Sequence, residues 1–252
     1  MITNDATPNQ ALADTNKIIQ GLWIGSELSV MEQLSIASFL LNGHEYHLYV
    51  YGDLKNIPAG TVVKDANEIL PASSIFQYKQ SPTYAGFSNF FRYKLLLERG
   101  GWWADTDTIC LKPFDFPDGH VFASEICRGL EVVNSGIIKA PTGSRVMAYA
   151  WQVCQTKKPQ QLVWGETGPT LIAEAVIRYS LEQYKKPHYV FCPIAYSDWQ
   201  KVIESDGEVV LDESNRAIHL WNEMWRAASQ DKNERYHHDC LYEQLKRKYL
   251  RI

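Results

Sequence analysis

The first fifty residues contain two apolar runs separated by a segment with helical spacing. Residues 17–24 form a mostly apolar run that ends at Gly25, and a second run follows at 47–51. Between them, apolar residues recur at helical spacing over 27–41 and are followed by Gly43. A period near 3.6 indicates a helix, and short apolar runs indicate buried strands. This order of strand, helix and strand predicts a βαβ unit, which implies a parallel sheet.

The most informative pattern lies at 84–113. Its apolar positions at helical spacing are Phe87, Phe90, Phe91, Leu95 and Leu97. Gly100 and Gly101 end this expected helix, and a short strand at 102–104 then leads into Asp105 and Asp107. In open α/β sheets, ligands bind beyond the carboxyl ends of strands. The two carboxylates are therefore expected at a functional site.

The remaining segments predict shorter elements. We expect strands at 121–124, 132–139, 189–192, 208–211 and 217–221. We expect helices at 144–153, from 167 to about 183, and in the tail from 235 to 252. Residues 1–16 lack periodicity and read as a loose lead-in to a single domain at 17–252 with a helical tail. The expected architecture is α/β, with a mixed central sheet and helices on both faces.

Composition narrows the class of protein. The chain has 252 residues, of which 45% are hydrophobic and 21% charged, so it can bury a large core. Its net charge of -4 argues against a nucleic-acid-binding surface, and we expect no nucleic-acid partner. The aromatic content of 12% is high, and Trp and Tyr often line sites that stack bases or sugars.

Cysteine usage and hydropathy point to an intracellular setting. The five cysteines are odd in number and include no Cys-x-x-Cys pair, which disfavours a disulfide scaffold and a zinc ribbon. Residues 1–17 lack the apolar core of a signal peptide, and no apolar run is long enough to span a bilayer. We expect a soluble cytoplasmic protein with reduced, mostly buried thiols.

The Asp105-Thr106-Asp107 motif suggests metal chemistry. Carboxylate oxygens bind Mg²⁺ or Mn²⁺, and such an ion can neutralise a nucleoside diphosphate as it leaves a sugar. One carboxylate can hold the ion while the other reaches sugar or ribose hydroxyls. An Asp-x-Asp alone is weak support, since a random chain of this length has roughly even odds of containing one. A solvated acidic turn therefore remains an alternative for these three residues.

The sequence around the motif is far more specific. It runs from Phe87 to Asp107 as FSNFFRYKLLLERGGWWADTD. This stretch resembles the DXD glycosyltransferases of the initiation-specific mannosyltransferase and globotriaosylceramide-synthase type. It is similar, more distantly, to the glucosyltransferase domains of large bacterial cytotoxins. The likeness is strong over 84–113 and looser at 18–51 and 164–225.

The resemblance implies a GT-A fold, which is the Rossmann-like fold of nucleotide-diphospho-sugar transferases. It implies a donor that is a UDP- or GDP-sugar, a Mn²⁺ or Mg²⁺ cofactor, and a saccharide or lipid-linked saccharide acceptor. The related enzymes retain the anomeric configuration, so we expect retention, with the departing phosphate accepting the proton of the acceptor. Synthesis of surface polysaccharide or glycoconjugate is the expected role.

The resemblance also implies roles for individual residues. Asp107 matches the metal-binding carboxylate, and Asp105 the one that contacts donor hydroxyls. Arg92 matches the helix arginine that reaches the donor, and these three are the expected catalytic residues. A structural ion pair from Arg92 to Asp105 or Glu98 is the alternative. Asn89 stands where the family usually has Asp, and it can still hydrogen-bond a ribose or sugar hydroxyl.

Residues outside this stretch complete the expected site. Trp23 resembles a tryptophan that stacks on the nucleobase, although core packing is nearly as good an explanation. His219 and Asn222 lie in a late segment that the resemblance expects to supply further metal ligands, with Asn222 also contacting the donor. An imidazole ligand favours manganese over magnesium. Residues 134–136 and 166–169 are expected to border the sugar pocket.

Two rival functions and one further contact stay open. A nucleotidyltransferase or metal-dependent phosphohydrolase also uses paired carboxylates and a divalent ion. The substitution at Asn89 leaves room for an inactive carbohydrate-binding descendant. The basic tail at 245–252 could rest on an anionic membrane, although a solvated helix end explains it as well.

Overall fold

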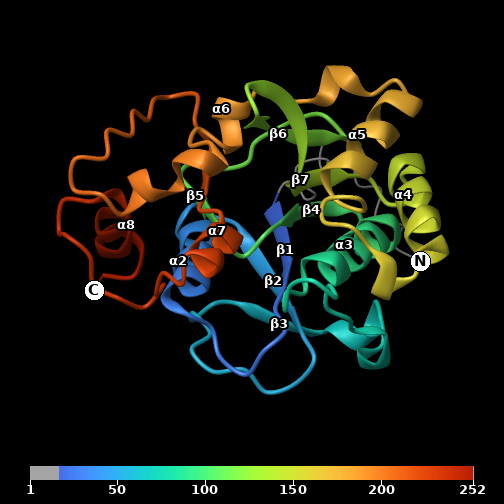
Figure 1. Cartoon of the computed structure of the whole chain (residues 1–252), viewed down its shortest axis with the longest axis horizontal. Helices are drawn as coiled ribbons and strands as arrows, with labels where there is room; N and C mark the ends of the chain where they lie inside the picture. The colour runs from blue at the N-terminus through green and yellow to red at the C-terminus, as the bar shows by residue number, and fades with distance from the viewer. Residues whose placement is uncertain (1–16, 252) are drawn as a thin grey trace, which may run out of the picture.

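The computed structural model of the protein describes residues 17–251 (Figure 1). The lead-in expected at residues 1–16 lies outside the described residues. Six strands form the central sheet, in the order β3-β2-β1-β4-β7-β6. Their bounds are β1 Ile18–Leu22, β2 Glu45–Val50, β3 Val62–Asp65, β4 Gly101–Ala104, β6 Val121–Cys127 and β7 Leu130–Ala140.

The predicted βαβ unit is confirmed. Helix α2 (Val30–Leu41) connects β1 to β2, and the two strands pair in parallel. The helix begins three residues later than the pattern alone indicates, because Ser29 and Glu32 form a capping box. In this motif the serine hydroxyl and the glutamate each accept from an otherwise unpaired backbone N–H of the first turn.

The sheet is mixed, as predicted. Strand β1 pairs in parallel with β2 and β4, whereas β7 runs antiparallel to both β4 and β6. Figure 1 shows α3 and α4 on one side of the sheet and α2 and α8 on the other. The bounds of the longer helices on both faces are α3 Ala85–Arg99, α4 Arg145–Thr156, α5 Pro169–Arg178 and α8 Leu241–Tyr249.

Neighbouring tryptophans in β4 fill the two cores. Trp102 belongs to the cluster that includes α2 and α8, and Trp103 belongs to the cluster that includes α3, α4 and α5. Both side chains are at most 1% exposed. Successive side chains in a strand point to opposite faces. The aromatic run of β4 therefore anchors both layers of helices to the strand that leads into the acidic motif.

A second, two-stranded sheet connects distant parts of the chain. Strand β5 (Thr108–Cys110) pairs antiparallel with β8 (Ala217–His219), with Thr108 opposite His219. The short helix α7 (Asn222–Ala227) begins three residues after β8. The pairing places the late segment of the chain directly beside the acidic motif.

Several sequence-based boundaries need correction. The strand expected at 189–192 is wrong: after Pro187 the chain forms a one-turn helix, α6 (His188–Phe191). Its Phe191 packs against the rings of Trp102 and Phe114, so it is buried without joining a sheet. The strand expected at 208–211 is also wrong, since this segment has no regular structure and Val210 is 82% exposed.

Other elements are shorter than expected or were missed. Helix α5 ends at Arg178 because Ser180 adopts a positive φ of 53°, and the tail helix covers only 241–249. Strands β3 and β5 were not predicted. All five cysteines are free thiols, and four of them are buried. Within the described residues, no helix is long and apolar enough to cross a membrane.

Candidate functional site

The two acidic side chains of the motif lie on a tight turn at the carboxyl end of β4. The N–H of Asp105 donates to the Gly136 carbonyl on β7 at 2.8 Å, and the N–H of Thr108 donates to the Asp105 carbonyl at 3.0 Å. A Cβ at position 136 would lie 2.8 Å from Asn134 Oδ1 and 3.0 Å from Asp105 Oδ2, so the glycine lets both side chains approach β7 closely. The turn is thus held between β7 and β5.

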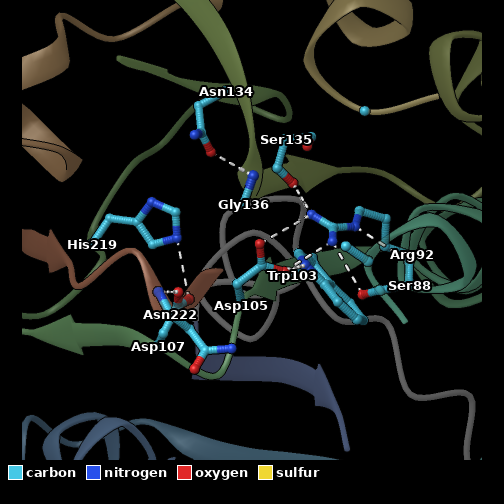
Figure 2. A network of polar contacts seen from close by, with 12 residues as sticks. Ser88, Arg92, Trp103, Asp105, Asp107, Asn134, Ser135, Gly136, His219 and Asn222 are labelled. Atoms are coloured by element: carbon cyan, nitrogen blue, oxygen red, sulfur yellow. Dashed lines mark hydrogen bonds and ion pairs between the residues drawn. The ribbon is translucent and has the colours of Figure 1, made fainter. Parts of the chain in front are cut away.

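Asp105 is bound by a buried arginine. Arg92 on α3 is 3% exposed, and its Nη2 lies 3.0 Å from Asp105 Oδ1. Its guanidinium also donates to the Ser88 hydroxyl and the Ser135 carbonyl, and it lies 4.9 Å from the ring centroid of Trp103 (Figure 2). The indole N–H of Trp103 donates to Asp105 Oδ1 at 2.8 Å. Of the two ion pairs considered for Arg92, the one with Asp105 is present.

Burial and charge act in opposite directions on Asp105. Removal from water raises the pKa of this carboxyl group, and the positive charge of Arg92 only partly offsets the rise. Glu98, the other partner considered for Arg92, pairs instead with Lys94 at 2.6 Å. The contacts with Arg92 therefore hold the Asp105 carboxylate in one orientation.

Asp107 faces the late segment of the chain. Its Oδ1 lies 3.1 Å from His219 Nε2, and its Oδ2 accepts from the backbone N–H of Asn222 at 2.8 Å. Burial alone would raise the pKa of Asp107, but His219 and the Asn222 N–H together hold it below its usual value. Burial likewise opposes the charged form of His219, yet the adjacent carboxylate raises the pKa of this imidazole well above its usual value.

Three side chains converge in a geometry that fits a divalent ion. One ligand atom each from Asp105, Asp107 and His219 lies within 4.8 Å of the others. Two carboxylates and an imidazole are suitable donors for Mn²⁺. Asn222 contributes its backbone N–H to Asp107, and its side chain lines the surrounding cavities. The predicted metal residues are thus brought together from two regions more than 100 positions apart.

Two cavities meet at the acidic pair. The narrower one, of ≈ 550 Å³, is lined by Trp23, Thr83, Ser88, Arg226 and Lys232. The wider one, of ≈ 760 Å³, is lined by Asn89, Glu125, Asn134, Trp164, His219 and Trp221. Both include Arg92, Asp105, Asp107 and Asn222 in their walls. The motif therefore lies at the junction of two chemically different spaces.

Trp23 and Asn89 lie on different sides of this junction. Trp23 is partly exposed in the narrower cavity, and the Lys232 ammonium lies 5.5 Å from its ring centroid. Its ring also packs against the core that includes α2, so part of the alternative explanation is present. Asn89 is 6% exposed and lines only the wider cavity, not the one that Trp23 lines.

The sequence reasoning overlooked one acidic residue of the wider cavity. Glu125 on β6 is 8% exposed, and burial raises the pKa of its carboxyl group. In the sequence it follows four residues of an ordinary buried strand, and no neighbouring motif marks it. The only local sequence feature that marks Glu125 is its charge, since its neighbours at 121–126 are apolar or small. Residues 134–136 line the same cavity, and of the segment expected at 166–169 only Pro169 does.

Comparison with known proteins decides the general class. Residues 9–123 match the family model described as a glycosyltransferase sugar-binding region containing a DXD motif. Residues 9–123 are thus similar to a glycosyltransferase region of the DXD type. The expected resemblance and enzyme class are therefore confirmed. The matched range includes Arg92, Asp105 and Asp107 of this glycosyltransferase, whereas His219 and Asn222 lie beyond it. No curated protein matches the sequence significantly.

One solved structure supports the fold. The structure described as PaToxG glycosyltransferase has a TM-score of 0.50 at 18% identity, over 68% of this chain and 75% of that one. A transferase mutant scores 0.43 at 12% identity, over 66% and 85%. The apo-form glycosyltransferase GlyE of Streptococcus pneumoniae TIGR4 scores 0.38 at 12% identity, over 67% and 44%. The first of these supports the predicted GT-A-like fold.

Proposed function

We propose that this glycosyltransferase is metal-dependent and transfers a hexose from a UDP- or GDP-sugar to a saccharide hydroxyl. The observation that carries the proposal is the convergence of Asp105, Asp107 and His219 where the two cavities meet. An ion held there would supply charge neutralisation to the diphosphate leaving group. In this arrangement Asp107 and His219 bind the ion, and Asn222 holds Asp107 through its backbone N–H.

The two cavities suggest where the nucleotide and the sugar of the donor bind. In the narrower cavity, the partly exposed ring of Trp23 provides a face for a nucleobase, and Lys232 adds positive charge beside it. In the wider cavity, the polar side chains of Asn89 and Asn134 can bind sugar hydroxyls. Arg92 orients Asp105 at the boundary, where a carboxylate can accept from a hydroxyl of the transferred sugar.

The finer features of the reaction are part of the same proposal. We propose retention of configuration, with the departing phosphate taking the acceptor's proton, and a role in surface polysaccharide or glycoconjugate synthesis. We also propose a cytoplasmic location, with peripheral membrane contact through the basic tail. In that tail Lys246 is 3% exposed and pairs with Glu243, so Arg247 and Lys248 are the exposed basic residues of α8.

A thermal-shift panel tests the proposed donor class. UDP, GDP and their common hexose conjugates are each added with Mn²⁺, with Mg²⁺ and with neither ion. We expect one nucleotide family to raise the melting temperature only when the ion is present. At a ligand concentration of about 100 Kd the expected stabilisation is ~2.7 kcal/mol, or several degrees for a chain of this size.

The same panel separates the proposal from its rivals. Release of free hexose from the stabilising sugar nucleotide, dependent on Mn²⁺, is the expected slow side reaction of a glycosyltransferase. Release of pyrophosphate from a nucleoside triphosphate would indicate a nucleotidyltransferase instead. If no nucleotide shifts the melting temperature in the presence of either ion, the proposed donor site is wrong.

Metal affinity is expected to increase with pH. In the metal-free protein the pKa of His219 is raised by Asp107, so the imidazole holds a proton that an ion must displace from Nε2. At pH values below this raised pKa, we expect the Mn²⁺ affinity to rise by about tenfold per pH unit. Calorimetric titration in buffers of different ionisation enthalpy should show close to one proton released per ion bound.

The His219→Asn variant is the control for this pH dependence. It retains a side chain that can accept or donate a hydrogen bond near Asp107 but has no group that titrates in this range. We expect weaker Mn²⁺ binding with a clearly smaller pH slope. An unchanged slope in this variant would show that another group releases the proton.

A further inference from the structure

Glu125 is a buried carboxylate whose position the fold alone does not explain. The carboxylates of Glu32 and Asp107 are similarly buried, and each has a cationic partner, Lys232 at 2.5 Å and His219 at 3.1 Å. For Glu125 no ion pair within 4 Å is found among the described residues. A buried carboxylate without such a partner is costly unless hydrogen bonds satisfy it.

The hydrogen bonds that do reach Glu125 come from the wall of the wider cavity. The Asn134 side chain hydrogen-bonds to this carboxylate, and Asn134 Oδ1 in turn accepts from the Gly136 N–H. The Gly136 carbonyl also accepts a hydrogen bond from the N–H of Asp105. Hydrogen bonds through Asn134 and Gly136 on β7 thus connect Glu125 to Asp105 of the acidic motif.

The surroundings of Glu125 suit a neutral polyol. A carboxylate repels phosphate and accepts hydrogen bonds from hydroxyl groups, while Asn134 can both donate and accept. Trp164 also lines this cavity; it is 54% exposed, and its ring centroid lies 5.3 Å from that of Tyr78. Polar side chains and an exposed aromatic ring are the two features that bind the hydroxyls and the apolar face of a sugar ring.

We propose that Glu125, supported by Asn134, binds a hydroxyl group of the hexose that occupies the wider cavity and so helps to select the sugar. This inference rests on the proposed function, since it assumes that the wider cavity holds a saccharide. The hydroxyl belongs either to the transferred hexose or to the acceptor, and both present the same chemistry to the carboxylate. Glu125 is then a substrate-binding residue that the DXD motif does not reveal.

The test compares the wild-type protein with Glu125→Gln. The amide keeps the size of the side chain and one acceptor oxygen but removes the charge. Binding of the free nucleoside diphosphate with Mn²⁺ is expected to stay within about twofold, because that ligand lacks the sugar. If the transferred hexose is the partner, binding of the sugar nucleotide and its Mn²⁺-dependent hydrolysis should each fall by about tenfold or more.

Further measurements distinguish binding of the transferred hexose, binding of the acceptor and a merely structural role of Glu125. If the acceptor is the partner, donor hydrolysis stays unchanged and transfer to methyl hexosides falls selectively. A structural role predicts a lower melting temperature, whereas removal of a buried charge that has no ion pair within 4 Å among the described residues should leave it unchanged or raise it. The matched control is Glu182→Gln, which removes the same charge from an exposed position.

Two failures remain distinguishable. Absence of Mn²⁺-dependent nucleotide binding in the wild-type protein would overturn the proposed function itself. With that binding intact, the inference about Glu125 is wrong if Glu125→Gln keeps donor binding and hydrolysis within about twofold and shows no selective loss of transfer to methyl hexosides. A fall in melting temperature together with equal losses for nucleotide and sugar nucleotide would also contradict it.

Discussion

Replacing Asp107 with asparagine is expected to lower the rate of sugar transfer by at least about a thousandfold, equivalent to ~4 kcal/mol of transition-state stabilisation. The amide keeps an oxygen that can accept from the Asn222 N–H. It loses the negative charge that faces His219 and that a divalent ion requires. Initial rates at saturating Mn²⁺ measure the effect, and a melting curve confirms that the variant is folded.

Asp206→Asn is the matched control for this loss of charge. Asp206 is exposed, so its replacement should leave transfer within about twofold and the free energy of unfolding within about 0.5 kcal/mol. Mn²⁺ binding should be lost or strongly weakened in Asp107→Asn and unchanged in Asp206→Asn. Transfer by Asp107→Asn within about tenfold of the wild-type rate would refute the metal-binding role.

Replacing Arg92 with methionine is expected to damage both stability and activity. The change leaves the partly buried Asp105 carboxylate beside Asp107 without its cation, and the Ser135 carbonyl without its donor. Breaking a buried pair in this way costs about 3 kcal/mol or more, which lowers the melting temperature of a chain of this size by roughly 6–12 °C. We expect transfer to fall by at least about a hundredfold, since Asp105 would no longer be held in one orientation.

A second substitution identifies the cause of that damage. In Arg92→Met with Asp105→Asn, no unpaired charge remains, so the double variant should be more stable than Arg92→Met alone by about 1–2 kcal/mol. The control Arg99→Met removes a cation from the exposed end of the same helix, where its ion pair with Glu68 at 3.5 Å contributes under about 1 kcal/mol. Strictly additive losses in the double variant would mean that Arg92 stabilises the fold through packing alone.

The parts of the fold that the sequence predicted are those with dense local signals. Helix α3 and strand β4 carry apolar spacing, paired glycines and an aromatic run within about twenty residues, and both form where expected. Strand β5 has only three residues, and its partner β8 lies over 100 positions later. Such a pairing depends on the tertiary structure, so a local pattern could not reveal it.

The wrong strand at 189–192 shows the limit of composition. Tyr189, Val190 and Phe191 favour strands by type, yet here Pro187 starts one helical turn and only Phe191 is fully buried. The site shows a similar limit. The acidic pair and Arg92 could be placed from one contiguous motif, whereas Glu125 required knowledge of which side chains face the wider cavity.

The ladder between β5 and β8 means that the proposed ion would join a segment near the middle of the chain to one in its last quarter. The region that matches the family model ends at residue 123, well before His219 and Asn222. A fragment restricted to that region would contain Asp105 and Asp107 but lose the Gly136 carbonyl that accepts from Asp105, one ligand, and the N–H that holds Asp107. Ion binding should therefore depend on completed folding. A bound Mn²⁺ would stabilise only chains in which the last quarter has already packed beside the acidic motif.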